Sequence, residues 1–378
     1  MIIDCPYPPI RCNILEQSLY RQRLCASRGT IKGIIQMIKK STIFAIIAIM
    51  LCFGIQLGAP DIGQANSSDY EIKIYTGEAS ETIKFFKSKN FWGEQAHDED
   101  LAVPPIIVAV VDKRWVKDAR NLPVNIKKEL FYRTIIPMIL FSNKLIMQER
   151  QELVAISRTL DRRKPLSEKE QTRLQSLGNK YGLPDSTDPG KQLGKLLERV
   201  DIIPPSLALG QAAYESGYGT SRFTLEGNAL FGQWTYAGGM KPREHRTSKG
   251  NYGVAAYNWP FDSVRAYMLN LNSHKAYKAL RGKRALLRRQ GKEITGMTLA
   301  ETLDKYSERG MEYVKTLHSI IRVNGLAIAD KAYLRNEPVT LVVEVGHTGN
   351  IQQTEAEIAE LRKSGELNRI IKSMQLHK

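Results

Sequence analysis

Apolar residues recur at helical spacing through most of the chain and at strand spacing in only a few short runs. Residues 125–160 combine spaced apolar positions with good helix formers, which predicts a long helical stretch that Pro137 should kink or divide. The Ser-Glu-Lys-Glu sequence at 167–170 has the form of a capping box and predicts a helix that runs to about residue 180. A further helix is expected over 189–199. This half of the chain is therefore predicted to be mostly helical.

The second half changes character twice. The sequence Pro-Pro-Ser at 204–206 starts a helix that should end at Gly217, because glycine readily adopts the left-handed conformation that closes helices. Residues 232–260 lack helical periodicity and are rich in glycine and aromatic residues, which indicates a small β-lobe. Helices then resume, and the tail has one strand-like run at 340–345 followed by an amphipathic helix from about Thr354. We predict an α+β fold that is mainly α.

One uncharged apolar segment stands apart near the start of the chain. Residues 41–57 follow two lysines at 39–40, and a small-residue exit follows at 63–65. This order of basic, apolar and small residues is typical of a signal peptide. At about 17 residues the segment is also at the lower limit for crossing a bilayer, so an uncleaved membrane anchor stays open. In either case we expect the rest of the chain to be exported to the periplasm or cell envelope.

These patterns suggest where the chain divides. Met37 opens the signal pattern, so we expect translation to start there and the preceding residues to be a leader outside the true protein. We expect the following parts: a leader over 1–36, a signal peptide or membrane anchor over 37–65, a polar tether over 66–102, a mainly helical N-terminal extension over 103–200, a catalytic domain over 201–330, and a C-terminal tail with a strand and a helix over 331–378.

Charge and cysteine content narrow the function classes. The net charge of +16 indicates a polyanionic partner, which charge alone does not identify as nucleic acid, a membrane surface or an anionic cell wall. The signal segment argues against nucleic acid. All four cysteines lie in the first 52 residues. The remaining chain therefore has no disulfide framework, thiolate metal site or nucleophilic cysteine.

Glu215 is the strongest candidate for chemistry. It falls in the last turn of the helix that ends at Gly217, on the apolar stripe of that helix. The negative end of the helix dipole and an apolar wall both disfavour ionisation, so both should raise the pKa of this carboxyl group. A general acid must arrive protonated, and small residues on both sides leave room for a sugar to approach.

The surrounding sequence resembles a known family. Residues 212–234 read AAYESGYGTSRFTLEGNALFGQW, residues 257–271 read YNWPFDSVRAYMLNL, and Tyr-Ser-Glu-Arg-Gly at 306–310 is followed by Tyr313-Val314. Together these motifs resemble the bacterial glucosaminidase family, in particular its Bax-type subgroup, over roughly residues 125–325. The resemblance implies a lysozyme-like helical core with a small β-lobe and hydrolysis of peptidoglycan beside N-acetylglucosamine.

The resemblance also implies roles for individual residues. Glu215 matches the essential acid of the family, and Tyr306 matches a tyrosine near the cleavage site. The stretch that follows the second short helix matches a groove wall. Aromatic faces suit the apolar faces of sugar rings. The candidate substrate-binding residues are Phe231, Gln233, Trp234, Tyr236, Tyr252 and Tyr257, although Phe231 fits the core of the lobe equally well.

A second carboxylate is harder to assign. Glu244 is the only acidic residue between Glu226 and Asp262, and it sits in a polar segment that reads as a loop. It is a candidate for activating water or stabilising positive charge in the transition state, and equally a surface charge paired with a neighbouring arginine. If Glu244 is not catalytic, the 2-acetamido oxygen of the substrate is the alternative group that would stabilise the positive charge.

The sequence therefore predicts a peptidoglycan hydrolase that needs no cofactor. No histidine shows a metal-binding spacing, and the chain has no nucleophile elbow or phosphate-binding loop. The expected partners are glycan strands and the anionic cell envelope. Two alternatives remain, namely a lytic transglycosylase that uses the same acid and a non-catalytic protein that binds the wall.

Overall fold

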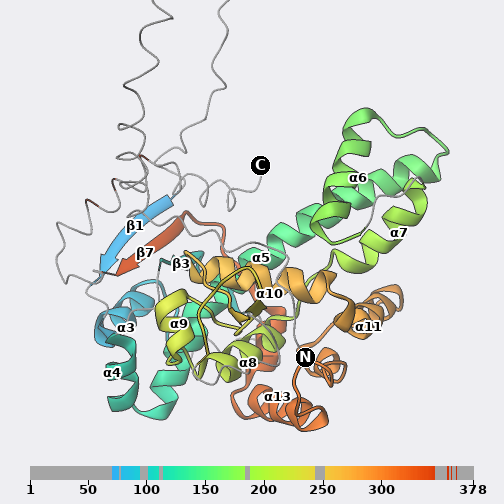
Figure 1. Cartoon of the computed structure of the whole chain (residues 1–378). Coiled ribbons are helices and arrows are strands. Elements are labelled where there is room, and N and C mark those ends of the chain that lie inside the picture. Colours follow the sequence, from blue (N-terminus) through green and yellow to red (C-terminus); the bar gives the residue numbers. More distant parts are fainter. Residues whose placement is uncertain are drawn as a thin grey trace, which may run out of the picture. The chain divides into compact units, whose positions relative to one another are not determined.

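The computed structural model describes residues 70–75, 78–93, 101–109, 114–183, 188–242 and 252–344, together with residues 356, 359 and 363. Helices dominate this part of the chain (Figure 1), and the predicted mainly α, α+β fold is confirmed. The α-helices are α3 (Ala79–Ser88), α4 (Arg114–Asn121), α5 (Val124–Asp161), α6 (Glu168–Lys180), α7 (Pro189–Arg199), α8 (Pro205–Ser216), α9 (Arg222–Gly227), α10 (Pro260–Ser273), α11 (Lys278–Arg289), α12 (Gly296–Ala300) and α13 (Met311–Val323). The 3-10 helices are η3 (Lys275–Tyr277) and η4 (Leu326–Lys331).

The strands are short and form small sheets. They are β1 (Tyr70–Tyr75), β2 (Ala102–Val103), β3 (Ile106–Val108), β4 (Trp234–Thr235), β5 (Gly253–Val254), β6 (Tyr333–Leu334) and β7 (Val339–Glu344). The central strand of a parallel sheet is β7, with β1 on one side and β3 on the other, as the neighbouring arrows of Figure 1 show. Strands β4 and β5 pair antiparallel within the segment predicted as the β-lobe. Strand β7 confirms the strand expected near residue 340.

Within the interval 66–102, which was predicted as a polar tether, the described residues form regular structure. The interval contains strand β1, which pairs with β7, and helix α3. Phe85 and Phe86 of α3 and the nearby Phe91 are buried in the main hydrophobic core. The polar residues of α3 hid this packing, because only one face of the helix is apolar and the run is short.

The core is built around two long-range helix contacts. The 38-residue helix α5 runs on through Pro137 without dividing and packs against α8 and α10. Among the described helices, α5 alone is long and apolar enough to cross a bilayer, but its most apolar stretch is 72% buried inside the protein. Such burial is typical of a core helix. The same hydrophobic cluster continues across residue 200, so the core does not divide where the extension was expected to end.

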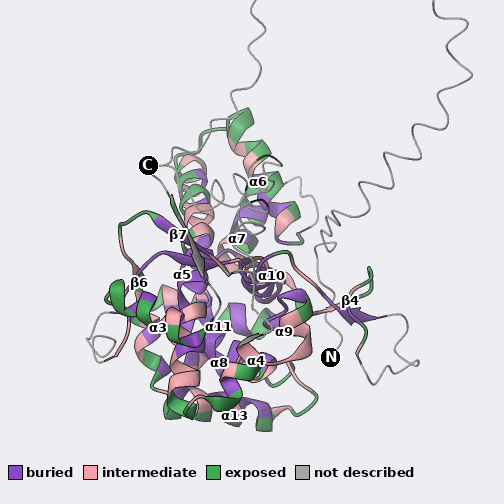
Figure 2. Ribbon diagram, turned by 90° about the vertical axis from the view of Figure 1, so that its left-hand side faces the viewer, coloured by how far each residue is buried: buried purple, intermediate pink, exposed green. Residues whose placement is uncertain are grey.

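Helix α8 is the most enclosed element. It packs against α5, α12, α13 and η4, and nearly all of its residues are buried (Figure 2). Asp330 of η4 anchors its first turn by accepting hydrogen bonds from the backbone amide and hydroxyl of Ser206, at 2.9 and 2.8 Å. The same carboxylate accepts from the Gly296 amide at 2.9 Å. A Cβ at Gly296 would lie 2.6 Å from the Leu207 amide nitrogen, so this close approach requires glycine.

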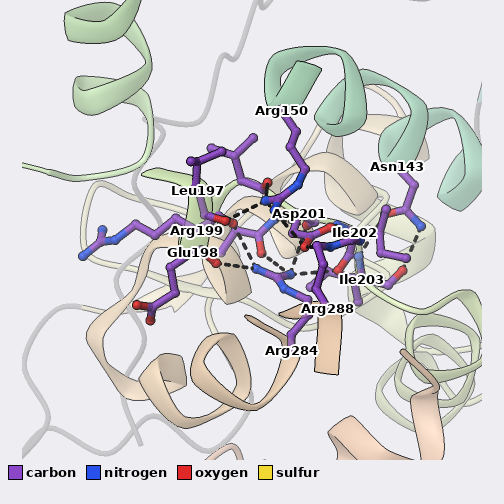
Figure 3. A network of polar contacts seen from close by, with 12 residues as sticks. Asn143, Arg150, Leu197, Glu198, Arg199, Asp201, Ile202, Ile203, Arg284 and Arg288 are labelled. Carbon is purple, nitrogen blue, oxygen red and sulfur yellow. Dashed lines mark hydrogen bonds and ion pairs between the residues drawn. The ribbon is translucent and has the colours of Figure 1, made fainter. Parts of the chain in front are cut away.

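A buried ionic network precedes α8 (Figure 3). Asp201 is 1% exposed and binds the guanidinium of Arg288 through both carboxylate oxygens, at 2.5 and 2.6 Å. Arg284 is fully buried and donates to backbone carbonyls at the end of α7, including those of Glu198 and Arg199. These carbonyls have no partner within their own helix, so the arginine side chains satisfy them. The network thereby fixes α7 and α11 against the start of α8.

Local signals at helix ends behaved as predicted. Ser167 and Glu170 form a complete capping box at the start of α6, and α7 spans the predicted residues 189–199. The predicted apolar segment 41–57 lies outside the described residues, as does most of the helix expected from Thr354.

Candidate active site

The end of α8 places Glu215 beside a tight turn. Gly217 closes the helix in the left-handed conformation, with φ of +57°, as the sequence predicts. Ser216 then bonds the turn internally, since its hydroxyl donates to the Ala212 carbonyl and accepts from the Gly219 amide at 2.8 Å. Ser221 caps the next helix, α9. The chain thus leaves α8 abruptly, and Glu215 remains at its last turn with a partly exposed side chain.

A hydrogen-bond chain leads from the core to Glu215. The hydroxyl of Tyr313, in α13, donates to Glu215 Oε1 at 2.9 Å. Gln211, one turn earlier in α8, donates from Nε2 to the Tyr313 hydroxyl at 2.9 Å. Tyr267 of α10 donates its hydroxyl to Gln211 Oε1 at 2.6 Å. Three helices that are far apart in sequence therefore converge on one carboxyl group.

Aromatic rings surround this carboxyl group. Tyr306 stacks on Tyr313 with ring centroids 5.3 Å apart, and it also lies 5.8 Å from the ring of Tyr277. Tyr214 packs edge-on against the other side of Tyr313 at 5.4 Å. Tyr306 was predicted from the family motif to lie near the cleavage site, and the structure places it in this cluster. Its role in catalysis stays a prediction.

The cluster changes the acidity of Glu215. Burial raises the pKa of Glu215 to about 7, and the Tyr313 hydrogen bond partly opposes this rise because it stabilises the carboxylate. Burial also raises the pKa values of Tyr267, Tyr306 and Tyr313, with a further contribution from the negative charge of Glu215. These hydroxyls therefore stay protonated near neutral pH, and those of Tyr267 and Tyr313 act as donors, while Glu215 exchanges its proton near pH 7.

Replacing Tyr313 with phenylalanine should raise the pKa of Glu215 further. A hydrogen bond to a charged group contributes roughly 1.5–3 kcal/mol, which corresponds to an upward shift of about one to two units. The measurement is ¹³C NMR titration of carboxyl-labelled glutamate, with Glu215→Gln identifying the signal. Tyr181→Phe is the matched control, because Tyr181 donates to the distant Glu149 at 2.7 Å. An unchanged or lower pKa in Tyr313→Phe would contradict the role given to this hydroxyl.

The aromatic residues that were predicted to bind substrate in the β-lobe differ in their exposure to solvent. Trp234 of β4 is partly exposed and stacks on Tyr252 with ring centroids 4.3 Å apart. Tyr252 is buried, so it supports Trp234 from behind instead of offering a face of its own. Tyr236 is 43% exposed, and Tyr257 is partly exposed. Trp234, Tyr236 and Tyr257 thus keep surface that a ligand can reach.

Two predicted contact residues belong to the interior. For Phe231 the structure supports the core alternative, because its side chain is 2% exposed and stacks on Tyr267 with ring centroids 3.8 Å apart. Gln233 is also buried, donating to the Ala266 carbonyl and accepting from the Tyr257 hydroxyl at 2.8 Å. Both side chains hold the lobe against α10 and do not form a wall that faces solvent.

Glu244 lies outside the described residues, so its prediction stands untested. Among the described residues, no second carboxylate is among the groups that shift the pKa of Glu215. Nor does this part of the chain bring together three or more histidine, cysteine or acidic side chains in a metal-binding arrangement. The described site thus offers one carboxyl group within a cluster of tyrosines.

Sequence reasoning missed three members of the site. Tyr313 was noted only as part of a motif, Gln211 only as part of an apolar stripe, and Tyr267 only as part of a helix. A glutamine on the buried face of a helix was the available signal, because a buried amide must find hydrogen-bond partners. The sequence gives no indication of which distant hydroxyls those partners are.

Comparisons with known proteins agree with this geometry. The family model described as mannosyl-glycoprotein endo-beta-N-acetylglucosaminidase matches residues 190–326, which contain the whole hydrogen-bond chain. The protein named Protein bax, from Escherichia coli (strain K12), is 34% identical over 214 residues, which are 56% of this chain and 75% of that protein. No solved structure matches the chain. This similarity, over residues that contain Glu215 and its tyrosine cluster, shows that the chain belongs to the Bax-type branch of the glucosaminidase family.

Proposed function

We propose that the protein hydrolyses the β-1,4 glycosidic bond next to N-acetylglucosamine in peptidoglycan, with Glu215 as general acid. Family membership indicates a peptidoglycan-related glycosidase, and the precise bond and reaction are our proposal. The observation that carries it is Glu215 itself. This carboxyl group has a pKa raised to about 7 and lies at a helix end among tyrosines. A pKa near the working pH is what an efficient general acid requires.

In the proposed reaction, Glu215 gives its proton to the glycosidic oxygen as the bond from that oxygen to the anomeric carbon breaks. The leaving sugar departs with a neutral hydroxyl, and positive charge develops at the anomeric carbon. Glu215 becomes a carboxylate that the Tyr313 hydroxyl stabilises at 2.9 Å. Water then adds to the anomeric carbon, and the proton that it loses returns to the Glu215 carboxylate. Glu244 or the 2-acetamido oxygen of the substrate would relieve the positive charge in between.

Sugar rings would lie against the partly exposed aromatic residues. Trp234 is the best candidate, because Tyr252 stacks behind it and holds its ring in place. A rigid aromatic face binds the apolar face of a pyranose with little loss of side-chain entropy. Tyr236 and Tyr257 are further candidates for this surface.

The site of action follows from the charge and the N-terminal segment. We propose that residues 37–65 direct export, or that 41–57 remain as an anchor, and that the enzyme works in the periplasm or cell envelope. The net charge of +16 would hold the protein on anionic wall material through a salt-sensitive attraction.

A lytic transglycosylase is the second candidate, favoured by one observation. No carboxylate of the described residues is among the groups that shift the pKa of Glu215, so none is identified as the group that activates water. A transglycosylase does not need one, since a hydroxyl of the sugar itself attacks and an anhydro end forms. Both reactions begin with the same proton transfer.

The product ends separate these proposals. The full chain, purified in mild detergent because of residues 41–57, is incubated with purified peptidoglycan, and the released ends are identified by mass spectrometry. Hydrated N-acetylglucosamine ends support the hydrolase. Anhydro-muramic ends make the protein a transglycosylase. Binding to peptidoglycan without any release would favour a non-catalytic wall-binding protein.

A further inference from the structure

The hydrogen-bond chain behind Glu215 is built from fully enclosed groups. The side chains of Gln211, Tyr267 and Tyr313 are all buried, and their hydrogen bonds span α8, α10 and α13. Each polar atom of the chain bonds to the next, from Tyr267 through Gln211 and Tyr313 to Glu215. Because buried polar groups are costly without partners, such a chain favours an arrangement in which every donor meets an acceptor, as it does here.

The chain also has a direction. A tyrosine hydroxyl has a single proton, so Tyr267, which donates to Gln211 Oε1, fixes that end of the amide as the acceptor. The amide nitrogen therefore faces Tyr313 and donates to its hydroxyl oxygen. Tyr313 must in turn direct its own proton to Glu215 Oε1. Any proton on Glu215 is consequently left to the other oxygen, Oε2.

We propose that Gln211 and Tyr267 are positioning residues that keep the Tyr313 proton on Glu215 Oε1, so that Oε2 is the atom that carries and delivers the acid proton. This inference rests on the proposed function, in which Glu215 is the general acid. Neither residue touches the substrate, and both act through Tyr313. Without them Tyr313 can turn its hydroxyl, and the acid proton is no longer confined to Oε2.

Among the described groups around Glu215, this hydrogen-bond chain is the main influence on its proton. The titratable groups that feel its charge are Tyr267 on α10, Tyr277 on η3, Tyr306 before α13 and Tyr313 on α13. A cation also reaches this cluster, because Arg309 donates to the hydroxyl of Tyr214, the residue before Glu215 on α8. The tyrosines stay neutral near pH 7 because burial raises their pKa values. The direct hydrogen bond to Glu215 therefore comes from Tyr313.

The test combines two substitutions with a direct measurement on Glu215. Gln211→Met has similar length and removes the relay, while Tyr267→Phe keeps the ring stacked on Phe231 and frees the amide to turn. We expect the pKa of Glu215 in Gln211→Met to rise by roughly half a unit, because Tyr313 becomes a weaker donor. Tyr267→Phe should shift it in the same direction by less. Glutamate ¹³C NMR measures this in the full chain, whether or not the protein is active.

Kinetics supply the second readout. In Gln211→Met we expect kcat at pH 5, where Glu215 is protonated in every variant, to fall by about tenfold with KM unchanged. The alkaline limb of the kcat profile should move upward with the NMR pKa. The double variant Gln211→Met/Tyr267→Phe avoids an orphaned Tyr267 hydroxyl and serves if the single variant unfolds. Tyr181→Phe, which removes a buried hydroxyl far from the site, should move neither quantity.

The outcomes separate this inference from the proposed function. An unshifted Glu215 pKa in both Gln211→Met and the double variant, while Tyr313→Phe shifts it, overturns the relay and leaves the hydrolase intact. If the Glu215 pKa shifts in the variants but the parent protein releases no glycan ends, the relay is supported and the proposed reaction is removed. A fall in kcat at pH 5 with no movement of the limb would mean that Gln211 only packs the core, which also overturns the proposal.

Discussion

Glu215→Gln is expected to reduce glycan cleavage by about 10²–10⁴-fold while leaving the protein folded. The amide has nearly the same shape and still accepts the Tyr313 hydrogen bond, but it has no proton to give to the glycosidic oxygen. The measurement is the rate at which reducing ends appear from purified peptidoglycan, with binding to the same material followed by co-sedimentation. Binding should persist, since the substitution removes chemistry and not contact area.

The same substitution should stabilise the protein in alkaline solution. The pKa of Glu215 is about 7 in the folded protein and 4.5 as the ordinary value, so folding favours its protonated form. Stability from this group is complete below pH 4.5 and is lost as pH rises through 7. Above pH 8 we expect Glu215→Gln to be more stable than the parent, by up to about 3 kcal/mol, and no such gain at pH 4. Urea unfolding at both pH values measures this.

Glu226→Gln is the matched control for both effects. Glu226 pairs with Arg222 at 3.0 Å on the surface of α9, and its side chain is 46% exposed. Its removal should change neither cleavage nor the pH dependence of stability. A Glu215→Gln protein that still cleaves peptidoglycan at the parent rate would remove Glu215 as the acid.

The sequence predicted those parts of the fold whose signals are local. The left-handed turn at Gly217, the capping box at Ser167 and the proline at the first turn of α7 each specify a helix end within a few residues. Gly217 likewise placed Glu215 in the last turn of its helix. The resemblance to the glucosaminidase family then singled out this residue as the candidate acid.

Contacts between distant segments could not be predicted in this way. Strand β1 pairs with β7, more than 260 residues later, and only this pairing shows that residues 70–75 belong to the folded body. For Phe231 the sequence left a groove wall and the core of the lobe equally open, and only its packing on Tyr267 places it in the core. In each case the deciding partner comes from another part of the chain.

The hydrogen-bond chain to Glu215 could not be predicted from the sequence for the same reason. Gln211 and Glu215 are neighbours on one helix, which the sequence shows, but their connecting hydroxyl is Tyr313, 98 residues after Glu215. Seven-residue separation of Tyr306 and Tyr313 in one motif gave no indication of which ring would contact the acid. Only the packing of α13 on α8 decides that Tyr313 does so.

Asp201→Asn is expected to lower the free energy of unfolding by about 3–5 kcal/mol. Asp201 accepts from two nitrogens of Arg288, and its carboxylate also lies 3.6 Å from Arg150. The fully buried Arg284 donates to the Asp201 carbonyl at 3.0 Å, so three cations surround one carboxylate (Figure 3). The amide has the same shape but removes the negative charge and turns a donor toward the Arg288 guanidinium. The buried cations then lose the charge that compensates them.

An exposed ion pair on the surface provides the control for the Asp201→Asn prediction. Glu152→Gln removes the partner of Arg173, where both side chains are more than one third exposed, and should cost less than about 1 kcal/mol. Urea unfolding of the two variants beside the parent measures both losses. A loss of less than 1 kcal/mol in Asp201→Asn would mean that the backbone carbonyls bound by Arg284 suffice to hold the cations. The expected larger loss would make Asp201 the charge that holds the arginines of α5 and α11 at the end of α7, in the segment that leads into α8.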